Sequence, residues 1–206
     1  MDNLIGRAAP DFRAPAVLED GEIDENFSFS EYLNGSYGIL MFYPLDFTFV
    51  CPSEIIALDR RTDAFTSRNT RLVAVSIDSQ FTHHAWRNTP LNKGGIGPVT
   101  FPLVSDVSKS IVRSFGVMAV NGEGHQDAVA LRATFLIDRS FVVRQATIND
   151  LPLGRNIEET LRLVDALQFH EQHGEVCPAG WKDGDPGMQP TADGVASYLS
   201  AHAGSL

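Results

Sequence analysis

The sequence lacks the features that mark several large classes of protein. Only two of its 206 residues are cysteines, which is too few for the disulfide framework of a small secreted domain. No uninterrupted apolar stretch approaches the about 20 residues that a membrane-spanning helix needs, and residues 1–7 show no signal-peptide core. We therefore expect a cytoplasmic protein that does not enter membranes.

Basic residues are also in the minority. The chain has 16 Lys and Arg residues against 26 Asp and Glu residues, which gives a net charge of -10. This charge argues against nucleic acid or an anionic membrane as a main partner. Hydrophobic residues make up 43% of the chain, enough for one substantial core. We expect one main domain over residues 1–170 and a C-terminal extension over residues 171–206, which begins with a Gly- and Pro-rich stretch.

The remaining pattern alternates strand-like and helix-like segments, which is typical of an α/β domain. Apolar runs that predict strands occupy residues 39–43, 72–77, 101–104, 128–137 and 141–148, the last two as a hairpin. Helical repeats follow Pro52 and occupy residues 82–87, 107–115 and 157–167. Thr191 is placed to cap a short terminal helix.

The two cysteines occupy different settings. Cys51 follows the predicted strand and a loop over residues 44–50, and Pro52 then opens a helix. Backbone N–H groups at a helix start favour an anion, so this setting suits a thiolate; the alternative is an inert, buried thiol. Cys177 lies too far along the chain for a Cys-x-x-Cys pair. A disulfide between the two needs a long-range contact or a second subunit.

Three side chains near or beyond Cys51 are candidates to assist it. The hydroxyl of Thr48 is placed to donate to a thiolate or to an incoming oxygen, and Pro44 would stiffen and shield the loop. Arg132 interrupts the apolar segment 130–137. Burying an unpaired charge in such a strand costs free energy, so we expect Arg132 to have a partner. Its alternative is an ordinary surface arginine on an edge strand.

Two more charged residues are candidates for a supporting network. Glu54 lies three positions after Cys51 and would repel a thiolate unless it is paired with an arginine, which it could then orient. Arg155 is a second cation for that network, with an exposed helix start as its alternative.

Histidines give weaker signals. The spacing of His170, His173 and Cys177 permits a zinc site, but a helix end carrying favourable imidazoles explains the two histidines more simply. The pair at residues 83–84 predicts a polar helix start, and Trp181 is expected to hold the segment that carries Cys177.

Two blocks of sequence resemble a known family. Residues 42–54, FYPLDFTFVCPSE, are similar to the active-site block of the typical two-cysteine peroxiredoxins, and residues 174–181, GEVCPAGW, are similar to their resolving-cysteine block. The similarity runs through nearly the whole chain, including residues 88–90 and 150–155. It implies a thioredoxin-like α/β fold, with a mixed central sheet flanked by helices and a C-terminal extension that carries the resolving cysteine.

The resemblance also assigns expected roles. It implies a peroxidase cycle without metal, haem or flavin, in which Cys51 attacks a hydroperoxide and becomes a sulfenic acid. The family's conserved active-site set corresponds to Pro44, Thr48 and Arg132, and its supporting network corresponds to Glu54 and Arg155. Cys177 corresponds to the resolving cysteine, which in this family comes from a partner subunit.

The implied partners follow from the same resemblance. They are a hydroperoxide, then thioredoxin or a flavoprotein disulfide reductase, and further copies of the chain in dimers that assemble into a ring of five. The tail carries Tyr198-Leu199 where peroxide-sensitive members carry Tyr-Phe, so we expect intermediate resistance of Cys51 to sulfinic acid formation. The alternative function is an oligomeric holdase chaperone or a peroxide-sensing redox relay.

Overall fold

The computed structural model describes residues 3–120 and 126–205. The chain divides into two compact units, Met1–Ile157 and Glu158–Leu206. The expected division into a peroxidase domain over residues 1–170 and an extension over residues 171–206 stays a prediction. Within the described residues, no helix combines the length and the apolar character needed to cross a bilayer.

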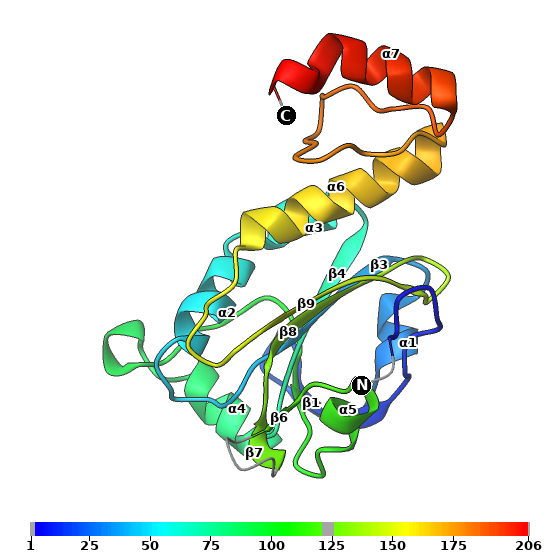
Figure 1. The fold of residues 1–206 in the computed structure, drawn as a ribbon. Coiled ribbons are helices and arrows are strands. Elements are labelled where there is room, and N and C mark those ends of the chain that lie inside the picture. Colours follow the sequence, from blue (N-terminus) through cyan, green and yellow to red (C-terminus); the bar gives the residue numbers. More distant parts are fainter. Residues whose placement is uncertain (1–2, 121–125, 206) are drawn as a thin grey trace. The chain divides into compact units, whose positions relative to one another are not determined.

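The first unit is built on a seven-stranded sheet in the order β2-β1-β5-β4-β3-β8-β9 (Figure 1). Strands β3, β4 and β5 run parallel to one another, and the other neighbours are antiparallel. The predicted mixed sheet is therefore confirmed. Its strands are β1 (Arg13–Val17), β2 (Ile23–Ser28), β3 (Tyr37–Phe42), β4 (Thr70–Ser76), β5 (Leu103–Ser105), β8 (Arg132–Ile137) and β9 (Val143–Asn149).

Two further strands lie outside this sheet. Strands β6 (Met118–Val120) and β7 (Gln126–Ala130) pair antiparallel with each other. The single strand expected over residues 128–137 is therefore wrong in its first part. The backbone N–H of Leu131 donates to Val117 O at 2.8 Å, and the chain joins the large sheet only at Arg132. The hairpin of β8 and β9 is confirmed.

Helices cover both faces of the large sheet, with α1 and α5 on one side and α2 and α4 on the other (Figure 1). Their bounds are α1 (Phe29–Leu33), α2 (Cys51–Asp59), α3 (Thr62–Thr66), α4 (Gln80–Arg87) and α5 (Ser110–Ser114). The second unit holds most of α6 (Ile157–His173), then α7 (Ala192–His202). The Thr191 hydroxyl accepts a hydrogen bond from the Gly194 N–H at 3.0 Å, which confirms the predicted cap.

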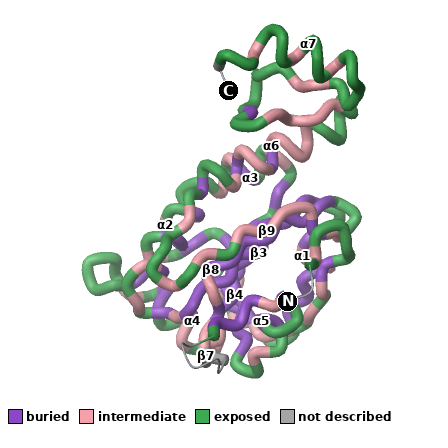
Figure 2. Tube along the Cα trace, viewed as in Figure 1, coloured by how far each residue is buried: buried purple, intermediate pink, exposed green. Residues whose placement is uncertain are grey.

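The core explains why the middle strands read as continuous apolar runs. All six residues of β3 are buried, because helices cover both of its faces (Figure 2). Alternate residues of β3 and β4 face the cluster that α1 and α5 complete. Its members include Phe29, Leu33, Leu40, Phe42, Val73, Val75, Ile111 and Phe115. The loop that leaves β3 therefore starts from a fully buried strand inside the sheet.

Candidate active site

Cys51 lies where the loop after β3 enters α2. It is the first residue of that helix, Pro52 follows it in the first turn, and its side chain is buried. Proline fits this position because the first helical N–H groups have no partner inside the helix. Pro44, at the start of the same loop, is also buried. The structure thus places a lone thiol at a helix start and out of bulk solvent.

Arg132 reaches the same place from a distant part of the sequence. Strand β8 runs antiparallel to β3 with Phe42 opposite Ala133, so β8 begins beside the point where β3 ends. The Arg132 side chain is only 5% exposed. The alternative of a surface arginine on an edge strand is wrong, because β9 lies on the outer side of β8.

Two polar groups contact the sulfur. The Thr48 hydroxyl oxygen lies 3.0 Å from Cys51 Sγ, and Arg132 Nη1 lies 3.4 Å from it. The same hydroxyl lies 2.8 Å from the carbonyl oxygen of Leu45. Its single proton serves one acceptor at a time, so Thr48 is able to donate to sulfur when sulfur is anionic and to Leu45 otherwise.

Glu54 links the two arginines. Its carboxylate accepts from Arg132 Nη1 at 2.7 Å, from Arg155 Nε at 2.9 Å and from Arg155 Nη2 at 3.0 Å. Burial by itself raises the pKa of Glu54, but hydrogen bonds and charge from Arg155, with a smaller effect of Arg132, bring that pKa below its ordinary value. Glu54 is therefore a carboxylate that holds Arg132 against the sulfur.

Arg155 ties this pair to the sheet. Its Nη1 donates to Phe42 O at 2.8 Å and to Ala133 O at 2.6 Å, at the adjoining ends of β3 and β8. Its side chain is 3% exposed, and burial lowers its pKa against the opposing effect of Glu54. Arg155 is thus a structural clamp on the carboxylate and not an exposed helix-start residue.

Two guanidinium groups and one carboxylate leave one positive charge in the buried cluster that contacts Cys51 Sγ. Buried charge is costly unless it is paired. The structure brings Cys51, Thr48, Arg132, Glu54 and Arg155 together, and their roles in catalysis stay a prediction.

Cys177 belongs to the second unit, on the segment after α6. Its sulfur donates to the carbonyl oxygen of Ala166 at 3.3 Å and is partly buried. Burial raises the pKa of the Cys177 thiol, and the nearby Arg162 guanidinium partly opposes this. Arg162 also donates to Trp181 O at 2.9 Å. Since the Trp181 ring is buried and packs at a tilt against the Phe169 ring, with centroids 4.8 Å apart, the segment is held against α6.

The residues of the alternative zinc site have other partners. Nδ1 of His170 donates to the carbonyl oxygen of Glu175 at 2.7 Å, and the His173 ring lies 4.6 Å from the Phe169 ring. In the part of the chain that the structure describes, no three His, Cys, Asp or Glu side chains are grouped to hold a metal.

A buried cluster below the active-site loop was missed. His83 is not a polar helix start: α4 begins at Gln80, and the His83 side chain is fully buried against Asp46. The available signal was its spacing three positions before Trp86, which places both on one helical face.

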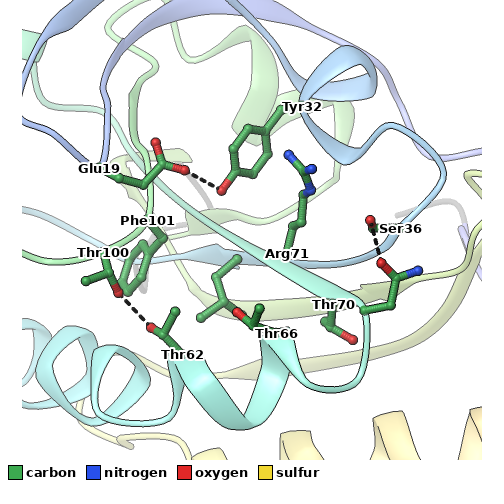
Figure 3. Close-up of a pocket in the computed structure, with 11 residues that line it drawn as sticks. Glu19, Tyr32, Ser36, Thr62, Thr66, Thr70, Arg71, Thr100 and Phe101 are labelled. Atoms are coloured by element: carbon green, nitrogen blue, oxygen red, sulfur yellow. Dashed lines mark hydrogen bonds between the residues drawn. The ribbon is translucent and has the colours of Figure 1, made fainter.

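Elsewhere in this unit, a cleft of about 320 Å³ lined by Tyr32, Arg71 and other side chains contains none of the predicted site residues (Figure 3).

Comparison with known families agrees with this geometry. Residues 5–146 match the model of the AhpC/TSA family, and residues 166–201 match a model described as the C-terminal domain of 1-Cys peroxiredoxin. The chain belongs to the AhpC/TSA family. The second matched region contains Cys177. This peroxiredoxin therefore has a second thiol in the region that the 1-Cys model matches.

Relatives match over nearly their full length. Alkyl hydroperoxide reductase C of Helicobacter pylori is 54% identical over 200 residues, 97% of this chain and 98% of that protein. Peroxiredoxin-2 of Mus musculus is 50% identical over 198 residues, 96% of each chain.

Solved structures of relatives show the same fold. Reduced 2-Cys peroxiredoxin of Plasmodium vivax superimposes with a TM-score of 0.89 at 46% identity, covering 97% of this chain and 100% of that chain. A Plasmodium yoelii Prx1a modified at its N-terminus, described as an artifactual octamer, gives 0.72 at 52% identity, covering 85% and 98%. The fold is therefore the thioredoxin-like α/β fold of the peroxiredoxins with a C-terminal extension.

Proposed function

We propose that this thiol peroxidase reduces hydrogen peroxide and organic hydroperoxides with Cys51 as the attacking residue. The observation that carries the proposal is the contact of a buried sulfur with two donors, Thr48 at 3.0 Å and Arg132 at 3.4 Å. Donors fixed beforehand stabilise charge on the reacting oxygens without reorganising during the reaction. Pro44 closes the loop over the site, and Glu54 and Arg155 hold Arg132 in place.

The first step oxidises Cys51. Its thiolate attacks the hydrogen-bearing oxygen of the peroxide, an S–O bond forms and the O–O bond breaks. Sulfur loses two electrons and becomes a sulfenic acid, while the leaving oxygen takes a proton and departs as water or an alcohol. Arg132 and Thr48 stabilise the charge that moves onto this leaving oxygen.

The second step uses Cys177 of a partner subunit. Its sulfur attacks the Cys51 sulfenic acid, a disulfide forms, and the oxygen leaves as water. Thioredoxin or a flavoprotein disulfide reductase then supplies the two electrons and two protons that restore both thiols. The proposal also includes homodimers that assemble further into decamers, and a cytoplasmic location.

Turnover distinguishes this function from a holdase or a redox relay. Purified protein is mixed with thioredoxin, thioredoxin reductase and NADPH, and NADPH oxidation is followed after addition of hydrogen peroxide or cumene hydroperoxide, then repeated with the flavoprotein reductase. We expect many turnovers per subunit with one of the two reductants, and none in Cys51→Ser. A single turnover that stops with both reductants would favour a relay and contradict the proposal.

A further inference from the structure

Three buried polar side chains below the active-site loop have no part in the chemistry proposed above. Tyr43 and Asp46 belong to the segment between β3 and α2, and His83 belongs to α4. The Tyr43 hydroxyl donates to Asp46 Oδ1 at 2.8 Å, and His83 Nδ1 lies 2.8 Å from Asp46 Oδ2. The side chains of His83 and Asp46 are both 0% exposed. Burying three polar side chains together costs free energy unless each of their polar atoms forms a hydrogen bond.

The hydrogen bonds fix where the protons lie. His83 Nε2 lies 3.2 Å from the carbonyl oxygen of Val104 in β5, and a carbonyl only accepts, so Nε2 carries a hydrogen. One proton then lies between His83 Nδ1 and the Asp46 carboxyl group. Without that proton, the Nδ1 lone pair would face a negatively charged carboxylate oxygen. Burial raises the pKa of Asp46, which His83 opposes. His83 is therefore a bridge from the loop to strand β5 of the sheet.

The loop needs such a bridge. Phe47, between Asp46 and Thr48, has φ of 53°, a left-handed conformation that aromatic residues rarely adopt. Strained backbone persists only where the surroundings hold it. The Asp46 backbone N–H donates to Asp78 Oδ2 at 2.9 Å, and the Phe47 ring lies 6.1 Å from the Trp86 ring. These contacts fix the chain two residues before Thr48.

We propose that His83 is a positioning residue for the peroxide step: through Asp46 it holds the loop in the conformation that keeps Thr48 against Cys51 Sγ. The inference rests on the proposed role of Cys51. Loss of the bridge lets Phe47 relax and Thr48 leave the sulfur, and displacement of a positioning group by about 1 Å is enough to slow an enzyme about 100-fold. The released loop is also freer to open, and because Cys51 is buried, its sulfur must become exposed before a partner's Cys177 is able to reach it.

Four variants test this inference, with two rates measured by rapid quench and thiol alkylation. The first is oxidation of Cys51 in a Cys177→Ser background, and the second is disulfide formation with Cys177 present, at a peroxide concentration high enough that oxidation of Cys51 is complete first. His83→Phe keeps the ring and loses both hydrogen bonds. We expect oxidation at least about tenfold slower and disulfide formation no slower than in the parent. His84→Phe is the matched control, because His84 is exposed; we expect it to leave both rates unchanged.

The second pair of variants remains informative if His83→Phe does not fold. In Asp46→Asn the amide donates to neutral His83 and its oxygen accepts from Tyr43, so we expect an oxidation rate within about threefold of the parent. Asp46→Leu makes neither bond and should match His83→Phe. Equal rates of Cys51 oxidation in Asp46→Asn and Asp46→Leu would overturn the inference, and so would a parental rate in His83→Phe. Peroxide turnover coupled to NADPH that persists in Cys51→Ser would instead overturn the proposed function.

Discussion

Thr48→Val is the sharpest test of how the site handles charge. Valine has nearly the shape of threonine, so the substitution removes the hydroxyl that lies 3.0 Å from Cys51 Sγ and leaves the packing in place. Removing one fixed donor from a charge-stabilising site costs about 2–4 kcal/mol, which slows the reaction about 30- to 900-fold. We expect this loss in the second-order rate of Cys51 oxidation, measured by single-turnover rapid quench with hydrogen peroxide.

A matched substitution separates the hydroxyl from general damage to the loop. Thr48→Ser keeps the donor and loses only a methyl group, so its oxidation rate should stay within about tenfold of the parent. Circular dichroism of both variants checks that the fold is retained. Equal rates for the parent and the valine variant would refute the reasoning, because the hydroxyl would then make no contribution to the transition state.

Further predictions concern the charged groups and the tail. Arg132→Ala should slow Cys51 oxidation by about 2–4 kcal/mol in the same single-turnover assay, and a parental rate would remove Arg132 from the mechanism. Because the folded state lowers the pKa of Glu54, its stabilisation is present above the unfolded pKa of about 4.3 and is lost as pH falls through the folded value. The free energy of unfolding, measured by denaturant titration, should therefore drop on acidification, and less so in Glu54→Gln. Because burial raises the pKa of Cys177, disulfide formation after a peroxide pulse should accelerate as pH rises beyond the usual thiol value of about 8.5; a flat profile contradicts this. Leu199→Phe should increase sulfinic acid at Cys51 in a peroxide titration followed by mass spectrometry, and an unchanged titration would make residue 199 irrelevant.

Sequence patterns located the nucleophile because its signals are local. The buried run before Cys51 and the proline after it are features of neighbouring residues, and they predict a strand, a loop and a helix start directly. The same holds for Thr48, whose distance from Cys51 along the chain already limits where its hydroxyl lies. The end helix was also predictable, since the cap at Thr191 needs only the residues that follow it.

The rest of the site depends on contacts between distant segments. Whether Arg132 was buried or exposed depended on β8 lying between β3 and β9, an order that local patterns do not specify. His83 was missed for a related reason: only the fold places α4 beneath the loop and brings an imidazole to Asp46. Polar residues that form buried pairs look like surface residues when each is considered alone.

The most direct test of the account is the disulfide itself. Reduced protein is given one equivalent of hydrogen peroxide, blocked with an alkylating agent and separated by non-reducing electrophoresis, for the parent, Cys51→Ser and Cys177→Ser. We predict a dimer-sized band in the parent that disappears in both variants and on reduction. A dimer-sized band that persists in both single variants would contradict the claim that Cys51 and Cys177 of two subunits form the catalytic pair.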